Sequence, residues 1–185
     1  MKKLFIVLLA VLLFALPVMA QEQDTPVEIS WEGEMEDSFI EKEYAGKFYL
    51  FEDYGIQFLV PGGMEPVELD EEDEAHGVFA YFEVPDAPEM HIVAQFLDYG
   101  VDTLEEVAMF EKEQRGDDML FGGYYVLNGL NAIMFVDTDS DAMICNIGTS
   151  SPQQFIKITL TPISNEELNA RSGYILASIQ PYSAE

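Results

Sequence analysis

Basic side chains are scarce in this sequence. Eight lysine and arginine residues stand against 35 aspartate and glutamate residues, and the formal net charge is −27. Nucleic-acid binding depends on lysine and arginine side chains that neutralise phosphates, so this composition argues against a nucleic-acid partner. The same charge opposes contact with anionic membranes and favours cationic partners or divalent ions. We therefore expect the partner to be a protein or a component of the cell envelope.

Cysteine and histidine are nearly absent, which removes common catalytic and metal-binding groups. Cys145 is the single cysteine, so the chain cannot form an internal disulfide. Its apolar neighbours predict a strand and a buried, inert thiol. His76 and His91 are the two histidines, and they lack the close spacing of zinc-binding pairs. We expect neither a zinc ion nor another cofactor, with calcium as the alternative.

Motifs of nucleophilic catalysis are also missing. The chain has no G-x-S-x-G elbow and no S-x-x-K sequence. The glycine-containing turns at 121–123 and 128–129 lack the spacing of a phosphate-binding loop. We therefore predict that the protein is not an enzyme, and we keep as an alternative a hydrolase whose site no motif reveals.

One long hydrophobic run occurs, and it lies at the start of the chain. Residues 4–16 carry no charge, follow Lys2 and Lys3, and precede small residues that end at Ala20. This arrangement is typical of a secretory signal that is cleaved after Ala20. The run is too short for a membrane span, which needs about 20 apolar residues. We predict that residues 1–20 are a signal peptide, that no stable membrane anchor remains after cleavage, and that the protein is secreted or periplasmic.

Two regions of different composition follow the predicted signal. Residues 21–46 are acidic with few apolar positions, and we interpret them as a mobile N-terminal arm that contributes one short edge strand. Residues 47–185 show no internal repeat and no linker, which indicates a single domain. Within this domain, apolar and strand-forming residues predict strands over residues 47–51, 56–60, 78–84, 90–97, 123–127, 132–136, 142–148 and 155–161.

Two capping boxes mark where helices begin. Thr103 is followed three residues later by Glu106, and Ser164 is followed in the same way by Glu167. In such a motif the hydroxyl and the carboxylate each accept a hydrogen bond from an exposed backbone N–H. The first helix is expected to end near residues 115–116, an arginine before a glycine. This order of strands and helices predicts an α+β fold, an antiparallel sheet flanked by helices.

Two local sequences carry a resemblance to a known family. Residues 54–63 read Tyr-Gly-Ile-Gln-Phe-Leu-Val-Pro-Gly-Gly, and residues 174–179 read Tyr-Ile-Leu-Ala-Ser-Ile. With the order of elements over residues 48–181, they make the chain resemble the PsbP-like superfamily. That group includes the extrinsic subunit of photosystem II, a Ran-binding import factor and bacterial DcrB-like envelope proteins. The resemblance implies an α/β/α sandwich and no shared catalytic residues, since a fold does not define a function.

One acidic turn has the spacing of calcium ligands. Asp137, Asp139 and Asp141 alternate along the chain, as at the start of an EF-hand loop. Alternate carboxylates in a tight turn can converge on a calcium ion, which prefers oxygen ligands. The loop position that should be glycine is Ala142, and the one that should be glutamate is Gly148. We favour a polar hairpin turn and keep a calcium-binding structural protein as the alternative.

Aromatic residues gather at the start of the predicted domain. Five of them occur at Tyr44, Phe48, Tyr49, Phe51 and Tyr54. If helices cover both faces of the sheet, these side chains belong to the core. If part of one face is open, tyrosines beside acidic residues would form a recognition surface. We favour the core.

Acidic residues occur only after residue 20, and their densest run is at residues 70–74. A solvated, flexible loop explains that run without a bound cation. Because no motif of a reaction is present, we predict an exported, non-enzymatic acidic domain. It would serve as a binding or accessory module of the cell envelope or of the secreted fraction.

Overall fold

A computed structural model describes residues 25–151 and 153–182, and the predicted signal peptide lies outside the described residues. The strands are β1 (Val27–Ile29), β2 (Gly46–Phe51), β3 (Ile56–Pro61), β4 (Glu65–Pro66), β5 (Val78–Val84), β6 (Ala87–Asp98), β7 (Met119–Leu127), β8 (Leu130–Asp137), β9 (Ala142–Gly148), β10 (Gln154–Thr161) and β11 (Gln180–Pro181). The helices are α2 (Glu34–Glu41), α3 (Glu71–Ala75), α4 (Leu104–Arg115) and α5 (Glu166–Ala177), with 3₁₀ turns η1 (Glu52–Tyr54) and η2 (Gly116–Asp118). None of these helices is long and apolar enough to cross a membrane.

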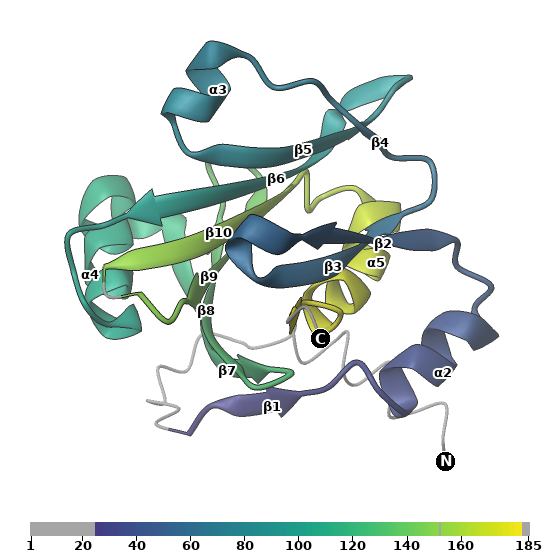
Figure 1. The fold of residues 1–185 in the computed structure, drawn as a ribbon, viewed down its shortest axis with the longest axis horizontal. Helices are drawn as coiled ribbons and strands as arrows, with labels where there is room; N and C mark the ends of the chain where they lie inside the picture. The colour runs from purple at the N-terminus through teal and green to yellow at the C-terminus, as the bar shows by residue number, and fades with distance from the viewer. Residues whose placement is uncertain (1–24, 152, 183–185) are drawn as a thin grey trace.

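Eight of the described strands form the main sheet, in the order β1-β7-β8-β9-β10-β6-β5-β4 (Figure 1). Neighbouring strands are antiparallel except for β1 and β7, which run parallel. Every strand predicted between residues 78 and 161 lies in this sheet and includes the predicted residues. The α+β fold is confirmed. The sheet is mixed, not wholly antiparallel, because the N-terminal strand joins its edge in parallel.

The hairpin predicted over residues 47–60 belongs to a separate, smaller sheet. Its order is β11-β3-β2, and β11 comes from the segment after α5. Together with α5, this sheet packs against one face of the main sheet, which we call the inner face. Buried side chains from both sheets and α5 form the largest core cluster, including Phe58, Val60, Ile92, Ala94, Met134, Cys145, Ile147, Ile156, Ile158, Leu160 and Ile175. A small sheet and a helix therefore cover this face, where the sequence had suggested helices.

Helix α4 packs on the opposite, outer face of the main sheet, where it contacts β7, β8 and β9. Leu104 and Ala108 pack there in a second cluster whose buried members are Met119, Ile133, Phe135, Ala142 and Ile144. The capping box at Thr103 is confirmed, since its hydroxyl oxygen accepts from the N–H of Glu106 and the Glu106 carboxylate accepts from the N–H of Thr103. The helix ends before Gly116, as predicted, and Gly116 has a positive φ of 66°.

The N-terminal segment that we interpreted as a mobile arm is structured from β1 onward. The short edge strand is present, whereas helix α2 was not expected. Trp31 lies between the two elements and packs on Phe39, which in turn packs on Tyr174 of α5. The backbone N–H of Trp31 donates to Oδ1 of Asn128 at 2.8 Å. A few large aromatic side chains thus bury enough surface to hold a segment that is otherwise acidic.

Two helix starts differ from the prediction. The N-cap of α5 is Asn165, whose side-chain oxygen accepts two backbone N–H bonds. Ser164, the predicted cap, instead bonds the carboxylate of Asp141 through its N–H and its hydroxyl. The acidic run at residues 70–74, predicted as a loop, supplies the N-cap and the first four residues of α3. There Asp70 and Asp73 form a reciprocal capping box, which acidic side chains favour at the positive end of a helix.

Candidate functional site

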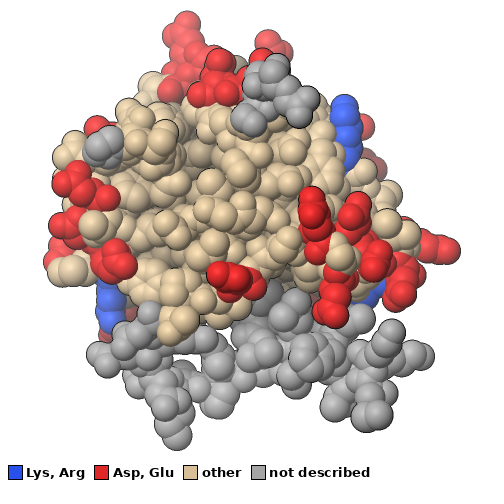
Figure 2. Space-filling view, turned by 60° about the horizontal axis from the view of Figure 1, so that its bottom comes forward, with Lys and Arg blue, Asp and Glu red and all other residues tan. Residues whose placement is uncertain are grey.

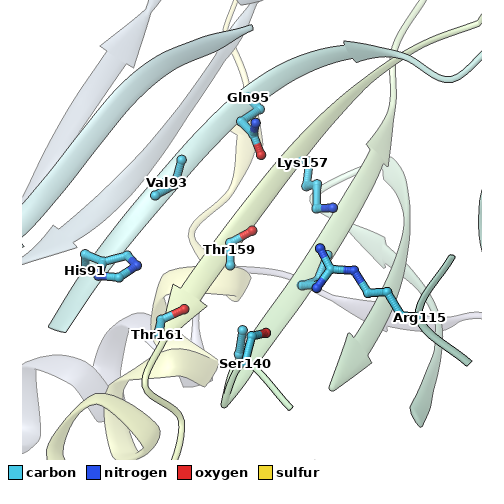
Figure 3. Close-up of a pocket in the computed structure, with 10 residues that line it drawn as sticks. His91, Val93, Gln95, Arg115, Ser140, Lys157, Thr159 and Thr161 are labelled. Carbon is cyan, nitrogen blue, oxygen red and sulfur yellow. The ribbon is translucent and has the colours of Figure 1, made fainter. Parts of the chain in front are cut away.

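Two hollows flank α4 on the outer face of the main sheet. The polar hollow has a volume of about 340 Å³ and lies over β6, β9 and β10, beside the C-terminal end of α4 (Figure 3). The apolar hollow has a volume of about 260 Å³ and lies between α4 and the strands β7 and β8. The first lies at the lower end of the usual size of small-molecule sites, and the second is slightly smaller than that range.

Period-two alternation along β10 places the polar side chains of the first hollow. Lys157, Thr159 and Thr161 point to the outer face, while the isoleucine and leucine residues between them belong to the core. The register pairs these three residues with Gln95, Val93 and His91 of β6, respectively. Figure 3 shows these labelled side chains along two neighbouring strands, beside Ser140 and Arg115. The sequence pattern of one strand therefore builds both an apolar core row and a polar floor.

A buried ionic network forms the wall of the polar hollow nearest α4. Nζ of Lys157 donates to Oε1 of Glu111 at 2.8 Å, and Glu111 is only 3% exposed. Arg115, one helical turn further along α4, pairs with Glu111 at 3.6 Å and with Asp137 at the end of β8. Two cations thus balance two carboxylates. The hollow is therefore locally neutral in a strongly acidic chain, and α4 is tied to the sheet by charge as well as by packing.

Uncharged groups extend the network below α4. The Tyr99 hydroxyl lies 2.7 Å from Oε1 of Glu111 and 2.9 Å from Oδ1 of Asn146. Burial, followed by the charge of Glu111, raises the pKa of Tyr99, so its hydroxyl remains protonated. Asn146 is fully buried, and its Nδ2 has no hydrogen-bond partner among the described residues. This group of side chains holds the helix in position and presents only Lys157 and Arg115 to the hollow.

The three aspartates considered as calcium ligands lie in different surroundings. Asp137 accepts hydrogen bonds from Arg115 and from Ser140, whose hydroxyl lies 2.7 Å away. Asp141 accepts from Ser164, and Asp139 is exposed to solvent. Among the described residues, no three histidine, cysteine, aspartate or glutamate side chains gather as a metal site. The polar hairpin turn is held by protein groups, and the calcium hypothesis stays a prediction.

The buried Asp137 carboxylate has a lowered pKa. Burial raises the pKa of this group, but hydrogen bonds from Ser140 and the nearby Arg115 guanidinium together outweigh that effect. Asp137 is therefore ionised at neutral pH and available to Arg115. Its role in the structure is to position the end of α4 over the sheet.

The histidines and the cysteine are far from forming a catalytic pair. His76 follows α3, and its Nδ1 lies 2.7 Å from the carbonyl oxygen of Glu72. His91 lines the polar hollow on the outer face, with Nδ1 at 3.2 Å from the carbonyl oxygen of Pro88. Cys145 points into the core on the inner face, where burial raises the pKa of its thiol to about 12. The buried position of the thiol is thus confirmed, and His91 lies on the opposite face of the sheet.

The early aromatic residues are part of the core, as favoured from the sequence. Tyr49, Phe51 and Tyr54 pack against the main core cluster, and Phe51 stacks on Phe58 with ring centroids 5.1 Å apart. Tyr44 and Phe48 pack in the cluster around Trp31. These side chains are only partly buried, because they lie on β2 or in the segments next to it, near the surface.

Large apolar side chains are exposed around the second hollow. Met109 of α4 and Phe121 of β7 line this hollow, and they are 65% and 52% exposed. We call these two residues, with the apolar hollow between them, the α4–β7 surface. Acidic residues lie at its rim. Burial raises the pKa of Tyr124 in the hollow, and the nearby carboxylate of Glu105 raises it further. The 3₁₀ turn η2, which contains two aspartates, precedes β7.

The sequence analysis missed this surface. The sequence did contain a signal for it, the adjacent apolar residues at 109–110 and 120–121. Consecutive side chains point in different directions in a helix and in a strand, so one element cannot bury both members of such a pair on the same face. A bulge in β7 after Phe121 also shifts the register, which no local pattern predicts.

Comparison with known proteins shows the fold. No family model matches the chain, and no curated protein matches it. The solution structure of cyanobacterial PsbP (CyanoP) from Synechocystis is similar, with a TM-score of 0.52 and 12% identity over 75% of this chain and 93% of that chain. The chain therefore has a PsbP-like fold, as the resemblance predicted.

Two further solved structures are similar at lower scores. A crystal structure from Bacteroides thetaiotaomicron is 12% identical over 75% of this chain and 49% of that chain, with a TM-score of 0.42. The Saccharomyces cerevisiae Ran-binding protein Mog1p is 10% identical over 74% of this chain and 95% of that chain, with a TM-score of 0.41.

Proposed function

We propose that this chain is an exported, non-enzymatic binding module whose partner docks on the α4–β7 surface. The observation that carries the proposal is the exposure of Met109 on α4 and Phe121 on β7, which both line the apolar hollow between the two elements. Contiguous apolar patches are typical of protein-binding surfaces, and methionine and aromatic residues are enriched in them. The predicted signal peptide supports export.

Charge indicates the chemistry of the partner. Glu105 lies near Tyr124 of the hollow, and Asp117 and Asp118 lie in the turn before β7. These three carboxylates outnumber Lys112, the one basic residue of the hollow lining, and the chain has a net charge of −27. Figure 2 shows one face of the molecule, on which acidic side chains gather toward the margins around a largely uncharged middle. A partner segment with apolar side chains flanked by lysine or arginine would complement both parts of the surface.

The geometry of the outer face supports a role without catalysis. The charged groups of the polar hollow are paired with each other, and both described histidines lie against backbone carbonyl oxygens. The thiol is buried on the inner face. An active site would need a free nucleophile or a base within reach of another reactive group.

Two exposed residues on different helices give a matched test of the binding surface. Met109 on α4 and Ile40 on α2 are both 65% exposed. We expect Met109→Glu to abolish capture of the partner from the native envelope fraction, because it puts a charge into the apolar contact. Ile40→Glu adds the same charge elsewhere and should bind as the parent protein does.

Cross-linking makes this test specific for the site. A photoreactive side chain in place of Phe121 should cross-link to the captured partner, and the yield should fall as the salt concentration rises. The same group in place of Ile40 should form no cross-link. Equal capture by the Met109→Glu and Ile40→Glu variants would contradict the proposal. An adduct from Ile40 alone would contradict it as well.

A further inference from the structure

Strand β2 forms a free edge of the smaller sheet. It pairs with β3 on one side, and no other strand of the described chain pairs with it (Figure 1). Unpaired edges present rows of backbone N–H and C=O groups that another extended chain can bond. The question is which residues of β2 direct these groups outward.

The hydrogen bonds of β3 show which residues of β2 these are. On the far side of β3 from β2, the N–H of Tyr182 donates to the Gly55 carbonyl oxygen at 2.8 Å, and the N–H of Leu59 donates to Oγ of Ser178 at 2.8 Å. Gln57 lies between them and pairs with Gln180 of β11. Backbone groups alternate in direction along a strand, so the odd-numbered residues of β3 face away from β2.

The register then assigns the outward groups of β2. Its bonded partners are the even-numbered residues of β3, which face Lys47, Tyr49 and Phe51. Those three residues therefore bond β3. Gly46, Phe48 and Leu50 must direct their N–H and C=O groups to the open side. Three residues with two groups each match the spacing of one added strand.

The side chains of β2 hold this edge in place. Tyr49 and Phe51 pack inward on the main core, and Phe48 packs on Trp31 at 5.6 Å between ring centroids. Leu50 is 42% exposed and adds an apolar contact beside the edge. Gly46 packs so closely on β3 that a Cβ would lie 2.9 Å from Cδ1 of Leu59. This end of the strand therefore has no side chain.

We propose that β2 accepts an extended segment of a partner protein as an additional strand, bonded to Gly46, Phe48 and Leu50. The segment carries lysine or arginine at its ends, because acidic residues flank the strand. Glu41 and Glu43 precede it, Glu52 and Asp53 follow it, and these four carboxylates outnumber the two lysines of the stretch, Lys42 and Lys47. Strand addition of this kind takes its affinity from backbone hydrogen bonds and its specificity from side chains at alternate positions.

A second copy of the chain fits this edge poorly. Antiparallel pairing of two β2 strands, with Phe48 opposite Phe48, would place Glu43 of one copy opposite Asp53 of the other, at both ends of the pair. Like charges opposite each other destabilise a sheet, and each chain has a net charge of −27. The occupant is therefore a cationic segment of a different protein.

A synthetic heptapeptide tests the proposal on the full protein without its signal. The probe alternates valine and threonine and has a lysine at each end. Amide exchange followed by NMR should slow about tenfold or more at Phe48 and Leu50 when peptide is saturating, because their N–H groups gain acceptors. Tyr49 already bonds β3 and should not change.

Matched peptides control for the chemistry. A version with glutamate at both ends should bind more weakly. A version N-methylated at every residue has both of its edges blocked and should give no protection. Unchanged exchange at Phe48 and Leu50 with millimolar lysine-ended peptide would overturn the proposal. Equal protection by the N-methylated peptide would overturn it too.

Two substitutions at one position test it from the side of the protein. Leu50→Pro removes one outward N–H and no bond to β3, so it should abolish peptide binding, whereas Leu50→Thr should retain it. Equal binding by both variants would overturn the proposal. If Leu50→Pro fails to fold, the N-methylated peptide decides the same point with the parent protein. Met109→Glu should leave peptide binding unchanged, which separates this edge from the α4–β7 surface.

Discussion

The two faces of the main sheet are built from the same strands and have opposite characters. On β10, Ile158 faces inward and is fully buried, while its neighbours Lys157 and Thr159 face the polar hollow. The inner face is covered by the smaller sheet and α5, and it carries the largest cluster of buried apolar side chains. The outer face is covered by α4 over only part of its width. The inner face therefore contributes most of the stability, and the outer face leaves part of its surface exposed.

The outer face itself divides along α4. Paired charges and threonines lie on one side of the helix, and exposed methionine and phenylalanine side chains lie on the other side. Paired charges hold the helix, so they contribute little attraction for a ligand. Unburied apolar side chains gain free energy when a partner covers them. This difference is why we place the docking surface on the β7 side.

Adjacent substitutions on β10 give the largest contrast between the faces. Ile158→Ala should lower the free energy of unfolding by about 4 kcal/mol, because it leaves a cavity in a core that cannot collapse around it. Thr159→Ala, one residue along, should change it by less than about 1 kcal/mol. Urea unfolding of both variants checks this. Equal losses would show that the outer face is packed as tightly as the inner one.

The ionic network gives the next largest effect. Lys157→Met should cost about 3 kcal/mol, since Glu111 is buried and loses its closest cation. The double variant Lys157→Met with Glu111→Gln should be more stable than Lys157→Met alone, because the remaining amide carries no charge. Thermal or urea unfolding measures both. A double variant less stable than the single one would mean that Arg115 compensates Glu111 without help.

Acid should weaken the ionic contacts of the outer face and leave the apolar contacts of the inner face unchanged. The folded pKa of Asp137 lies below its ordinary value of 3.8, so the stabilisation it contributes is present above pH 3.8 and is lost as the pH falls through the folded value. Asp137→Asn should remove this part of the pH dependence. Unfolding free energies measured between pH 2 and 6, roughly the range in which carboxylates titrate, should show a flatter slope for the variant.

Calcium should have the smallest effect. Because Asp137 and Asp141 are bonded to Arg115 and Ser164, millimolar calcium should leave the melting temperature unchanged. A ligand that binds the native state must stabilise it, so a rise in melting temperature would support the calcium alternative. Asp139→Asn is the control, since it removes the exposed carboxylate and no contact within the turn.

Local patterns in the sequence predicted most of the strands and the start of α4. Alternation along β10 and β9 places each side chain on one of two faces, and the capping box at Thr103 depends on residues three apart. The same patterns could not assign β2 and β3 to a second sheet. That choice depends on β11, more than 100 residues away, and pairing over such distances leaves no local trace.

The candidate site was predicted less well for the same reason. The sequence drew attention to Asp137 and His91, which do lie at the polar hollow or its wall. It missed the pairing of Glu111 with Lys157, although each is a charged residue within an apolar stripe. Such a residue signals a buried partner but does not identify it, because the partner is 46 positions away.

The chain's acidity, its alternating strands and its inert thiol were readable from residue order, since each depends on composition or on neighbours a few residues apart. Which strands share a sheet, which charges neutralise each other and which edge stays open depend on contacts between distant segments. These contacts form only when burial of the inner face brings the segments together. The free edge of β2 and the uncovered side of α4 are what that packing leaves exposed.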